Sequence, residues 1–175
     1  MSDPQFQPAV EFGLSPSELR LVRVGPEWKA RFADERRRIA KALGLAALDI
    51  QHIGSTAVPG LTAKPVLDIA VAIRDFEAGH AAVPLLVAIG YAYRGENGIP
   101  RRHFFMRDGT HHLHLFENES SDWQRHLRFR DRLVSSPELT ARYSQIKLTA
   151  AEQANGNREF YQTLKSSFIE EFQKA

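Results

Sequence analysis

One aspartate and two histidines have the residue types and the spacing to perform chemistry together. Asp68 interrupts the apolar stretch PVLDIAVAI, and His112 and His114 stand two residues apart in HHLHLFE. Because alternate residues of a strand share a face, both histidines are expected to point away from the neighbouring leucines, onto the face where Asp68 would also lie. A carboxylate and two imidazoles can bind a divalent metal such as Mg²⁺, Mn²⁺ or Zn²⁺. With the nearby Arg-Arg-His run, the cluster could hold a divalent metal or a phosphate. We predict Asp68, His112 and His114 as the metal ligands, with Asp68 and His114 as catalytic residues.

Each of these side chains also has a structural interpretation. An aspartate among apolar strand residues often caps a turn or pairs with a basic side chain, and neighbouring histidines often satisfy backbone groups. Because an unpaired buried charge is costly, we favour a functional role for Asp68. His52 shares a strand face with Ile50 in the earlier stretch ALDIQHI. It is expected either in the core or beside Asp68.

The loop HIGSTAVPGLTAK, which precedes the acidic stretch, has the composition of a phosphate-binding turn. Gly54 lets the backbone approach a phosphate closely, while Ser55 and Thr56 add hydroxyl groups to the backbone N–H donors. Lys64 follows as a counter-charge. Many strands end in a Gly-Ser turn that binds no ligand, so this loop indicates a phosphate site only in combination with the acidic residue downstream. We expect these four residues to bind a phosphate or nucleotide.

The excess positive charge is local rather than spread over a surface. The chain carries 23 basic and 21 acidic side chains, a net charge of +2, which is too weak a field to indicate nucleic-acid binding. Basic residues gather between positions 94 and 107, and Arg102 or His103 is expected there to neutralise a phosphate. The predicted partner is a small phosphorylated ligand or a nucleotide, with neither nucleic acid nor membrane. The run at 36–38 is expected on the solvated side of a helix.

Length and composition bound the class of protein. The 175 residues are 43% hydrophobic and 25% charged, which is typical of one globular domain. The absence of cysteine excludes disulfides, thiolate zinc sites and cysteine nucleophiles. No signal segment or membrane span is apparent, so a cytoplasmic location is expected. We predict a loose arm over residues 1–20 and a single domain over 21–175, with a sheet part to about 118 and a helical part from about 119.

Periodicity and turn residues place these candidates on an α+β scaffold. Pro26 opens and Gly44 closes a first helix, and a second is expected over 75–90, cut or started near Pro84. About five strands are predicted, over residues 47–53, 65–73, 91–94, 103–108 and 111–117. Three helices should follow, over 121–134, 138–153 and 158–174.

The stretch HIGSTAVPGLTAKPVLDIAVAI closely resembles the signature of the GrpB family. RRHFFMRDGTHHLHLFE resembles that family's central hairpin, and HLRFRDRL, PELTARYSQIK and REFYQTLKSSFIEE resemble its C-terminal helices. The resemblance implies a nucleotidyltransferase-like fold, a mixed sheet of about five strands packed by helices. Lys147, Arg158, Tyr161 and Lys165 match polar positions of the family pattern. Tyr161 and Lys165 are expected either at the rim of a cleft or as a half-buried tyrosine and a snorkelling lysine.

The sequence departs from active nucleotidyltransferases at the residues that hold their metal ions. The resemblance implies two carboxylates two residues apart, but here Asp68 is followed by Ala70, and histidines stand where a third carboxylate would be expected. Two hypotheses follow. One is a metal-assisted, nucleotidyltransferase-like enzyme acting on a nucleotide or another phosphorylated small molecule. The other is a degenerate domain that binds such a ligand without chemistry. Kinase activity is not expected, because the chain lacks a G-x-x-x-x-G-K-[ST] loop.

Overall fold

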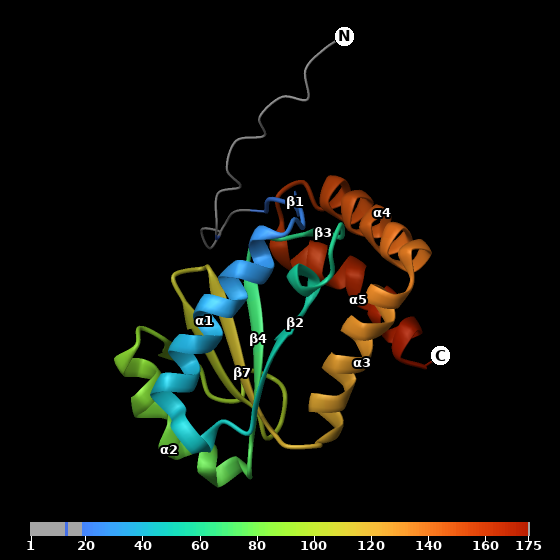
Figure 1. The fold of residues 1–175 in the computed structure, drawn as a ribbon. Helices are drawn as coiled ribbons and strands as arrows, with labels where there is room; N and C mark the ends of the chain where they lie inside the picture. Colours follow the sequence, from blue (N-terminus) through green and yellow to red (C-terminus); the bar gives the residue numbers. More distant parts are fainter. Residues whose placement is uncertain (1–12, 14–18, 175) are drawn as a thin grey trace.

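The computed structural model describes residue 13 and residues 19–174, so most of the arm expected over residues 1–20 lies outside the described part (Figure 1). The strands there are β1 Val22–Arg23, β2 Asp49–Ile53, β3 Thr62–Ala63, β4 Leu67–Ile73, β5 Ala92–Tyr93, β6 His103–Arg107 and β7 His111–Glu117. The α-helices are α1 Glu27–Leu43, α2 Phe76–Ala88, α3 Ser121–Ser135, α4 Pro137–Ala154 and α5 Arg158–Lys174. Within the same residues, no helix combines the length and apolar composition that crossing a membrane requires.

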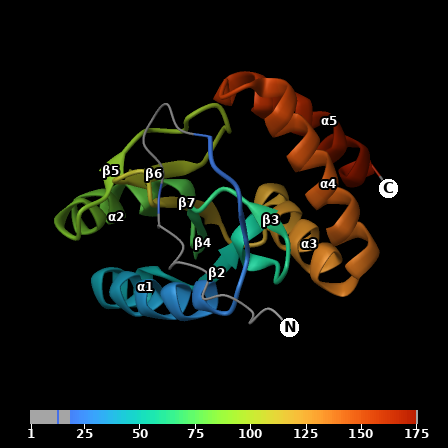
Figure 2. The ribbon, with the colours of Figure 1, turned by 90° about the horizontal axis from the view of Figure 1, so that it is seen from above.

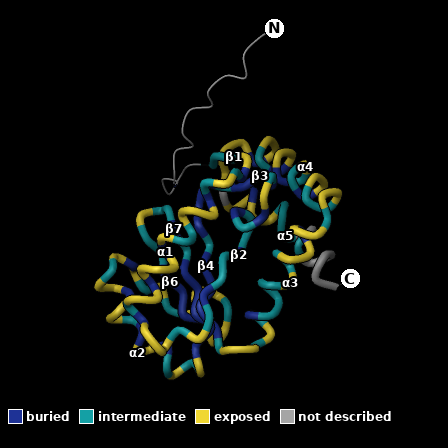
Figure 3. Tube along the Cα trace, in the orientation of Figure 1, coloured by how far each residue is buried: buried dark blue, intermediate teal, exposed yellow. Residues whose placement is uncertain are grey.

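Five strands form a mixed sheet in the order β2-β4-β7-β6-β5. β4 runs parallel to β7, and the other neighbours are antiparallel. The two central strands are buried almost throughout, as the continuous dark segment in Figure 3 shows. This arrangement confirms the predicted α+β class and the five-stranded mixed sheet. The short ribbon of β1 and β3 was not predicted, because two-residue strands are too short to show alternation.

Helices cover both faces of the sheet (Figure 2). α1 and α2 bury their apolar side chains against one face, where Leu67, Ile69 and Leu113 belong to the same core cluster as Trp28 and Leu86. α3 packs on the other face, and α4 and α5 pack against each other beyond it. The second face therefore carries a helical layer that the C-terminal third of the chain supplies.

Helix ends follow local chemistry, with one exception. α1 lies between Pro26 and Gly44, as predicted, and Gly44 has a φ of 54°. α2 was expected to be cut or started near Pro84, but it runs through this residue. The Asp75 carboxylate caps its first turn by accepting from the Ala78 N–H at 2.7 Å. Burial of Leu86 against the sheet then holds the second half in place, despite the hydrogen bond that proline removes.

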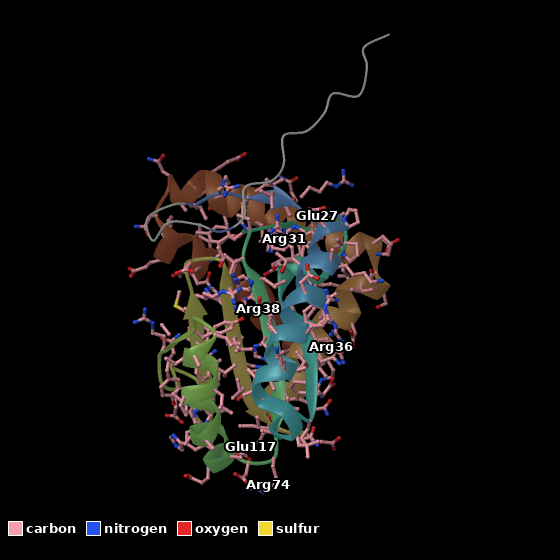
Figure 4. The ribbon with its side chains drawn as sticks, turned by 60° about the vertical axis from the view of Figure 1, so that its left-hand side comes forward. Glu27, Arg31, Arg36, Arg38, Arg74 and Glu117 are labelled. Atoms are coloured by element: carbon pink, nitrogen blue, oxygen red, sulfur yellow. The ribbon has the colours of Figure 1, made fainter. Side chains whose placement is uncertain are left out.

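A buried ion pair fastens α1 to the sheet. Glu35 is 4% exposed and accepts two hydrogen bonds of 2.8 Å from the Arg107 guanidinium and one of 3.0 Å from the Tyr91 hydroxyl. Burial raises the pKa of Glu35, but Arg107 outweighs it, and the pKa lies below its usual value. The run at 36–38 is exposed, as predicted, and Figure 4 shows Arg36 and Arg38 along α1.

Candidate functional site

Asp68 and the two histidines lie on the face of the sheet that α3 covers. In the strand register Asp68 is opposite His112, and Ala70 is opposite His114. One Asp68 carboxylate oxygen, Oδ1, lies 2.9 Å from His112 Nδ1 and 3.9 Å from His114 Nε2. Burial raises the pKa of Asp68, but the two imidazoles outweigh it and hold the pKa well below its ordinary range. The aspartate is therefore a stable anion held by two rings.

Gly54 brings the loop after β2 into contact with this carboxylate. Its backbone has a φ of 68° and a ψ of −168°, a region that side chains other than hydrogen strongly disfavour. A Cβ atom at this position would lie 2.6 Å from Asp68 Oδ2. Glycine is thus required twice, for the turn and for the close approach.

Two lysines of the C-terminal helices lie near the same loop. Lys147 of α4 is 2% exposed, and its ammonium group donates to Ser55 Oγ and, at 2.9 Å, to the carbonyl of Thr62. Burial, reinforced by the charges of Lys165 and Lys64, holds the pKa of Lys147 well below its usual value. Burial lowers the pKa of Lys165, in α5, to about 8. The site therefore gathers two amines of lowered pKa near one carboxylate.

A cavity of about 430 Å³ opens beside the Gly54–Ser55 turn, a volume in the range of small-ligand sites. Its polar wall includes Ser55, Asp68, His114, Arg125, His126 and Lys165. Its apolar wall includes Ile53, Ile99, Phe129, Tyr143 and Ile169. Strands β2, β4 and β7 thus contribute one side of the cavity, and α3, α4 and α5 the other.

Several predicted ligand residues have structural partners outside the cavity wall. Thr56 is buried and donates to the Val66 carbonyl at 3.1 Å, so the 3.0 Å contact with His52 Nε2 makes that ring nitrogen the donor. His52 itself stacks on Phe32 of α1, on the core face, with ring centroids 5.0 Å apart. Tyr161 is 1% exposed and packs with residues of α4, which fits neither of the two positions expected for it.

The structure also separates Arg102 from His103. His103 begins β6 opposite Leu115, on the face covered by α2, where its Nε2 lies 2.8 Å from the Phe76 carbonyl. Arg102 stays on the Asp68 side and contacts His114. Lys64 is not among the cavity residues, but its charge acts on both Lys147 and Lys165. Of the predicted phosphate ligands, Gly54, Ser55 and Lys165 line the cavity.

Sequence reasoning did not single out the cavity residues of α3. Arg125 and His126 line the cavity, and His126 Nδ1 donates to the Asp122 carbonyl at 2.7 Å. The rings of His126 and His114 lie 5.9 Å apart. The signal was a histidine and an arginine on the polar side of an amphipathic helix, which is also the pattern of an ordinary solvated face.

The donors at Asp68 do not fit the predicted metal site. Among the described residues, no three histidine, aspartate or glutamate side chains come together in a way that could hold a metal ion. Ala70, at the position where the resemblance implies a second carboxylate, is fully buried. His112 is also absent from the cavity wall. We therefore derive no reaction step through a metal.

Comparison with known proteins places this geometry in a fold with known members. The chain is 15% identical to a cytoplasmic RNA terminal U-transferase, with a TM-score of 0.52 over 77% of this chain and 41% of that one. At this identity the likeness concerns the fold alone. It supports the nucleotidyltransferase-like architecture expected from the sequence.

Closer relatives cover most of the chain. GrpB from Enterococcus faecalis matches with a TM-score of 0.83 at 30% identity, over 89% of this chain and 95% of that structure. The UPF0157 protein BH1888 of Halalkalibacterium halodurans is 33% identical over 99% of this chain and 91% of its own length. The UPF0157 protein YqkA of Bacillus subtilis is 34% identical over 78% of this chain, which spans only 40% of that relative. The family model described as GrpB protein matches residues 18–175. The chain therefore belongs to the GrpB family.

Proposed function

We propose that this protein binds a nucleotide or another phosphorylated small molecule in the cavity beside the Gly54–Ser55 turn. The observation that carries the proposal is the placement of cationic side chains at this cavity. Arg125 and Lys165 line its wall, and the charge of Asp68 acts on Lys165 and on the buried Lys147 behind Ser55. Holding cations in a dry site is costly unless an anion compensates them. A phosphate group would supply that anion.

The shape of the cavity supports a ligand with two different ends. Phe129 and Tyr143 meet edge to face, with centroids 5.8 Å apart, on the apolar wall. Lys165 and Ser55 stand on the polar wall. An aromatic base or another apolar group would contact the first wall, while its phosphate would contact the second. A nucleotide has both parts.

Calorimetric titration tests the proposal with nucleoside mono-, di- and triphosphates and sugar phosphates. The wild-type protein should bind at least one of them, and Lys165→Met should weaken that binding about 10- to 100-fold, since a hydrogen bond to a charged group contributes about 1.5–3 kcal/mol. Lys41→Met, in the exposed last turn of α1, is the matched control and should bind as the wild type does. Absence of binding by every compound would overturn the proposal.

A second candidate function is catalysis of the nucleotidyltransferase type. It is favoured by the position of Asp68 in the cavity wall, against a Gly-Ser turn, within a fold shared with a terminal U-transferase. The same compounds should be incubated with and without Mg²⁺, Mn²⁺ and Zn²⁺ and searched for turnover that Asp68→Asn abolishes. Binding without turnover under all these conditions would support the ligand-binding function and refute the hypothesis of catalysis.

A further inference from the structure

We propose that the Asp68 centre works without a divalent metal, and that His112 donates a hydrogen bond to the carboxylate while His114 directs an N–H group at it. This inference deepens the proposed function, on which its statement about the ligand rests. The phosphorylated ligand would be held directly by lysine ammonium groups instead of through a bridging metal ion. Arg102 is the residue that fixes this arrangement.

The Arg102 guanidinium is itself held in place. It is 5% exposed, and its Nε and one terminal nitrogen donate to the Glu96 carbonyl at 3.2 and 3.1 Å. The same terminal nitrogen donates to the Asn97 carbonyl at 2.7 Å. The Phe104 ring lies 4.7 Å from its central carbon. With these contacts the guanidinium has no room to turn away from the sheet.

The second terminal nitrogen of Arg102 lies 3.3 Å from His114 Nδ1. A guanidinium has five N–H donors and no acceptor, so Nδ1 must present its lone pair. His114 is therefore neutral and carries its proton on Nε2, the nitrogen that lies 3.9 Å from Asp68 Oδ1. This tautomer is assigned from the partners of the ring. It directs an N–H group, and not a lone pair, at the carboxylate.

Metal binding shared with Asp68 would require the opposite tautomer. The Nε2 lone pair would have to face the ion, and the proton would move to Nδ1, against the donors of Arg102. His112 adds a second donor, because its Nδ1 lies 2.9 Å from Asp68 Oδ1 and an ionised carboxylate only accepts. The same carboxylate oxygen thus accepts a hydrogen bond from His112 and faces the N–H group of His114. Ala70 offers no further ligand.

The consequence for the ligand follows from the charges nearby. Asp68 is a single negative charge, whereas Lys165 lines the cavity beside it and the charge of Lys64 acts on Lys165. An anionic ligand can therefore be compensated by lysine side chains directly. Its binding should not depend on a divalent ion.

Nitrogen NMR of the histidine rings and metal titration of the full chain test the inference. The wild-type protein at neutral pH should show His112 protonated on Nδ1 and His114 on Nε2. It should take up no stoichiometric Mn²⁺ or Zn²⁺ at micromolar concentrations. One equivalent of either metal that Asp68→Asn removes, or a His114 ring protonated on Nδ1, would overturn the inference. Uptake that Asp68→Asn leaves intact would belong to another site and would support a metal-free Asp68.

Ligand measurements separate this inference from the proposed function. If a phosphorylated compound binds, its affinity should change less than twofold when EDTA is added, and a loss of tenfold or more would overturn the metal-free centre. If no compound binds, the proposed function fails. The ring tautomers and the metal uptake then still decide the inference, because both are measured on the free protein.

Discussion

Replacing Gly54 with alanine tests the contact between the loop and Asp68. The substitution has two separate costs. The backbone at φ 68° and ψ −168° lies in a region that is almost restricted to glycine, which costs a residue with a Cβ about 1–3 kcal/mol. The new methyl group would also lie 2.6 Å from Asp68 Oδ2 and 2.9 Å from Asp68 Cβ. Forcing an extra methyl into packed surroundings costs about 1–3 kcal/mol.

Together these costs predict that Gly54→Ala lowers the free energy of unfolding by about 2–6 kcal/mol, a large part of the stability of a typical domain. Gly60→Ala is the matched control, because Gly60 also has a positive φ, 76°, but a Cβ there would meet no atom within 4 Å. Its loss should be about 1–2 kcal/mol. Urea unfolding followed by circular dichroism measures both variants. Equal losses in the two variants would refute the claim that Asp68 packs against the loop.

Three further predictions concern buried charges. Glu35→Gln should lower the free energy of unfolding by about 3–5 kcal/mol at pH 7, because it leaves Arg107 buried without its anion, while Asp34→Asn on the exposed side of α1 should change it by less than about 0.5 kcal/mol. The pKa of Glu35 is lower in the folded protein than in the unfolded chain, where it is 4.5. The stability that the Glu35 carboxylate contributes is therefore present above pH 4.5 and is lost as the pH falls through the folded pKa. The free energy of unfolding of Glu35→Gln, measured in urea, should accordingly depend less on pH in acid than that of the wild type. Lys147→Met should raise the urea midpoint and weaken ligand binding, since it removes a buried amine of strongly lowered pKa; a lower midpoint would contradict this assignment. Because the pKa of Lys165 is about 8, binding of an anion should raise this pKa, so the protein should take up protons on binding near pH 8. Calorimetry in buffers of different ionisation enthalpy detects this uptake. A binding enthalpy that is the same in every buffer would count against contact between Lys165 and the ligand.

Strand alternation is the property of this sequence that determined most of the fold. HHLHLFE was predicted as a strand over 111–117, and β7 spans His111–Glu117. Leu113 and Leu115 alternate with histidines, and burial of the leucines against α1 and α2 fixes which face the histidines occupy. The two-residue strands of the β1–β3 ribbon have no such period. Their pairing depends on tertiary contacts that no local pattern records.

The same alternation explains why the predicted phosphate ligands Arg102 and His103 could not serve together. Neighbouring residues at a strand start point to opposite faces, so a site on one face receives only one of them. Phe104 pairs with His114 and His103 with Leu115, which places His103 against α2. That Arg102 and His103 are neighbours in the sequence therefore predicted that both lie near the site, but not which of them faces it.

The lysines of the site show what a global charge count conceals. A net charge of +2 describes the whole chain, whereas the shifted pKa values of Lys147 and Lys165 describe one buried place. Lys147 donates to Ser55, 92 residues earlier in the chain, so the local sequence contains no signal for their contact. Burial of Lys147 lowers the stability of the free protein, because its amine loses water and donates to two neutral groups, Ser55 Oγ and the Thr62 carbonyl. An anion that binds nearby would compensate for this cost and would explain why the fold retains the amine. For this reason the proposed ligand site depends more on Lys147 and Lys165 than on the Gly-Ser turn by which the sequence first indicated it.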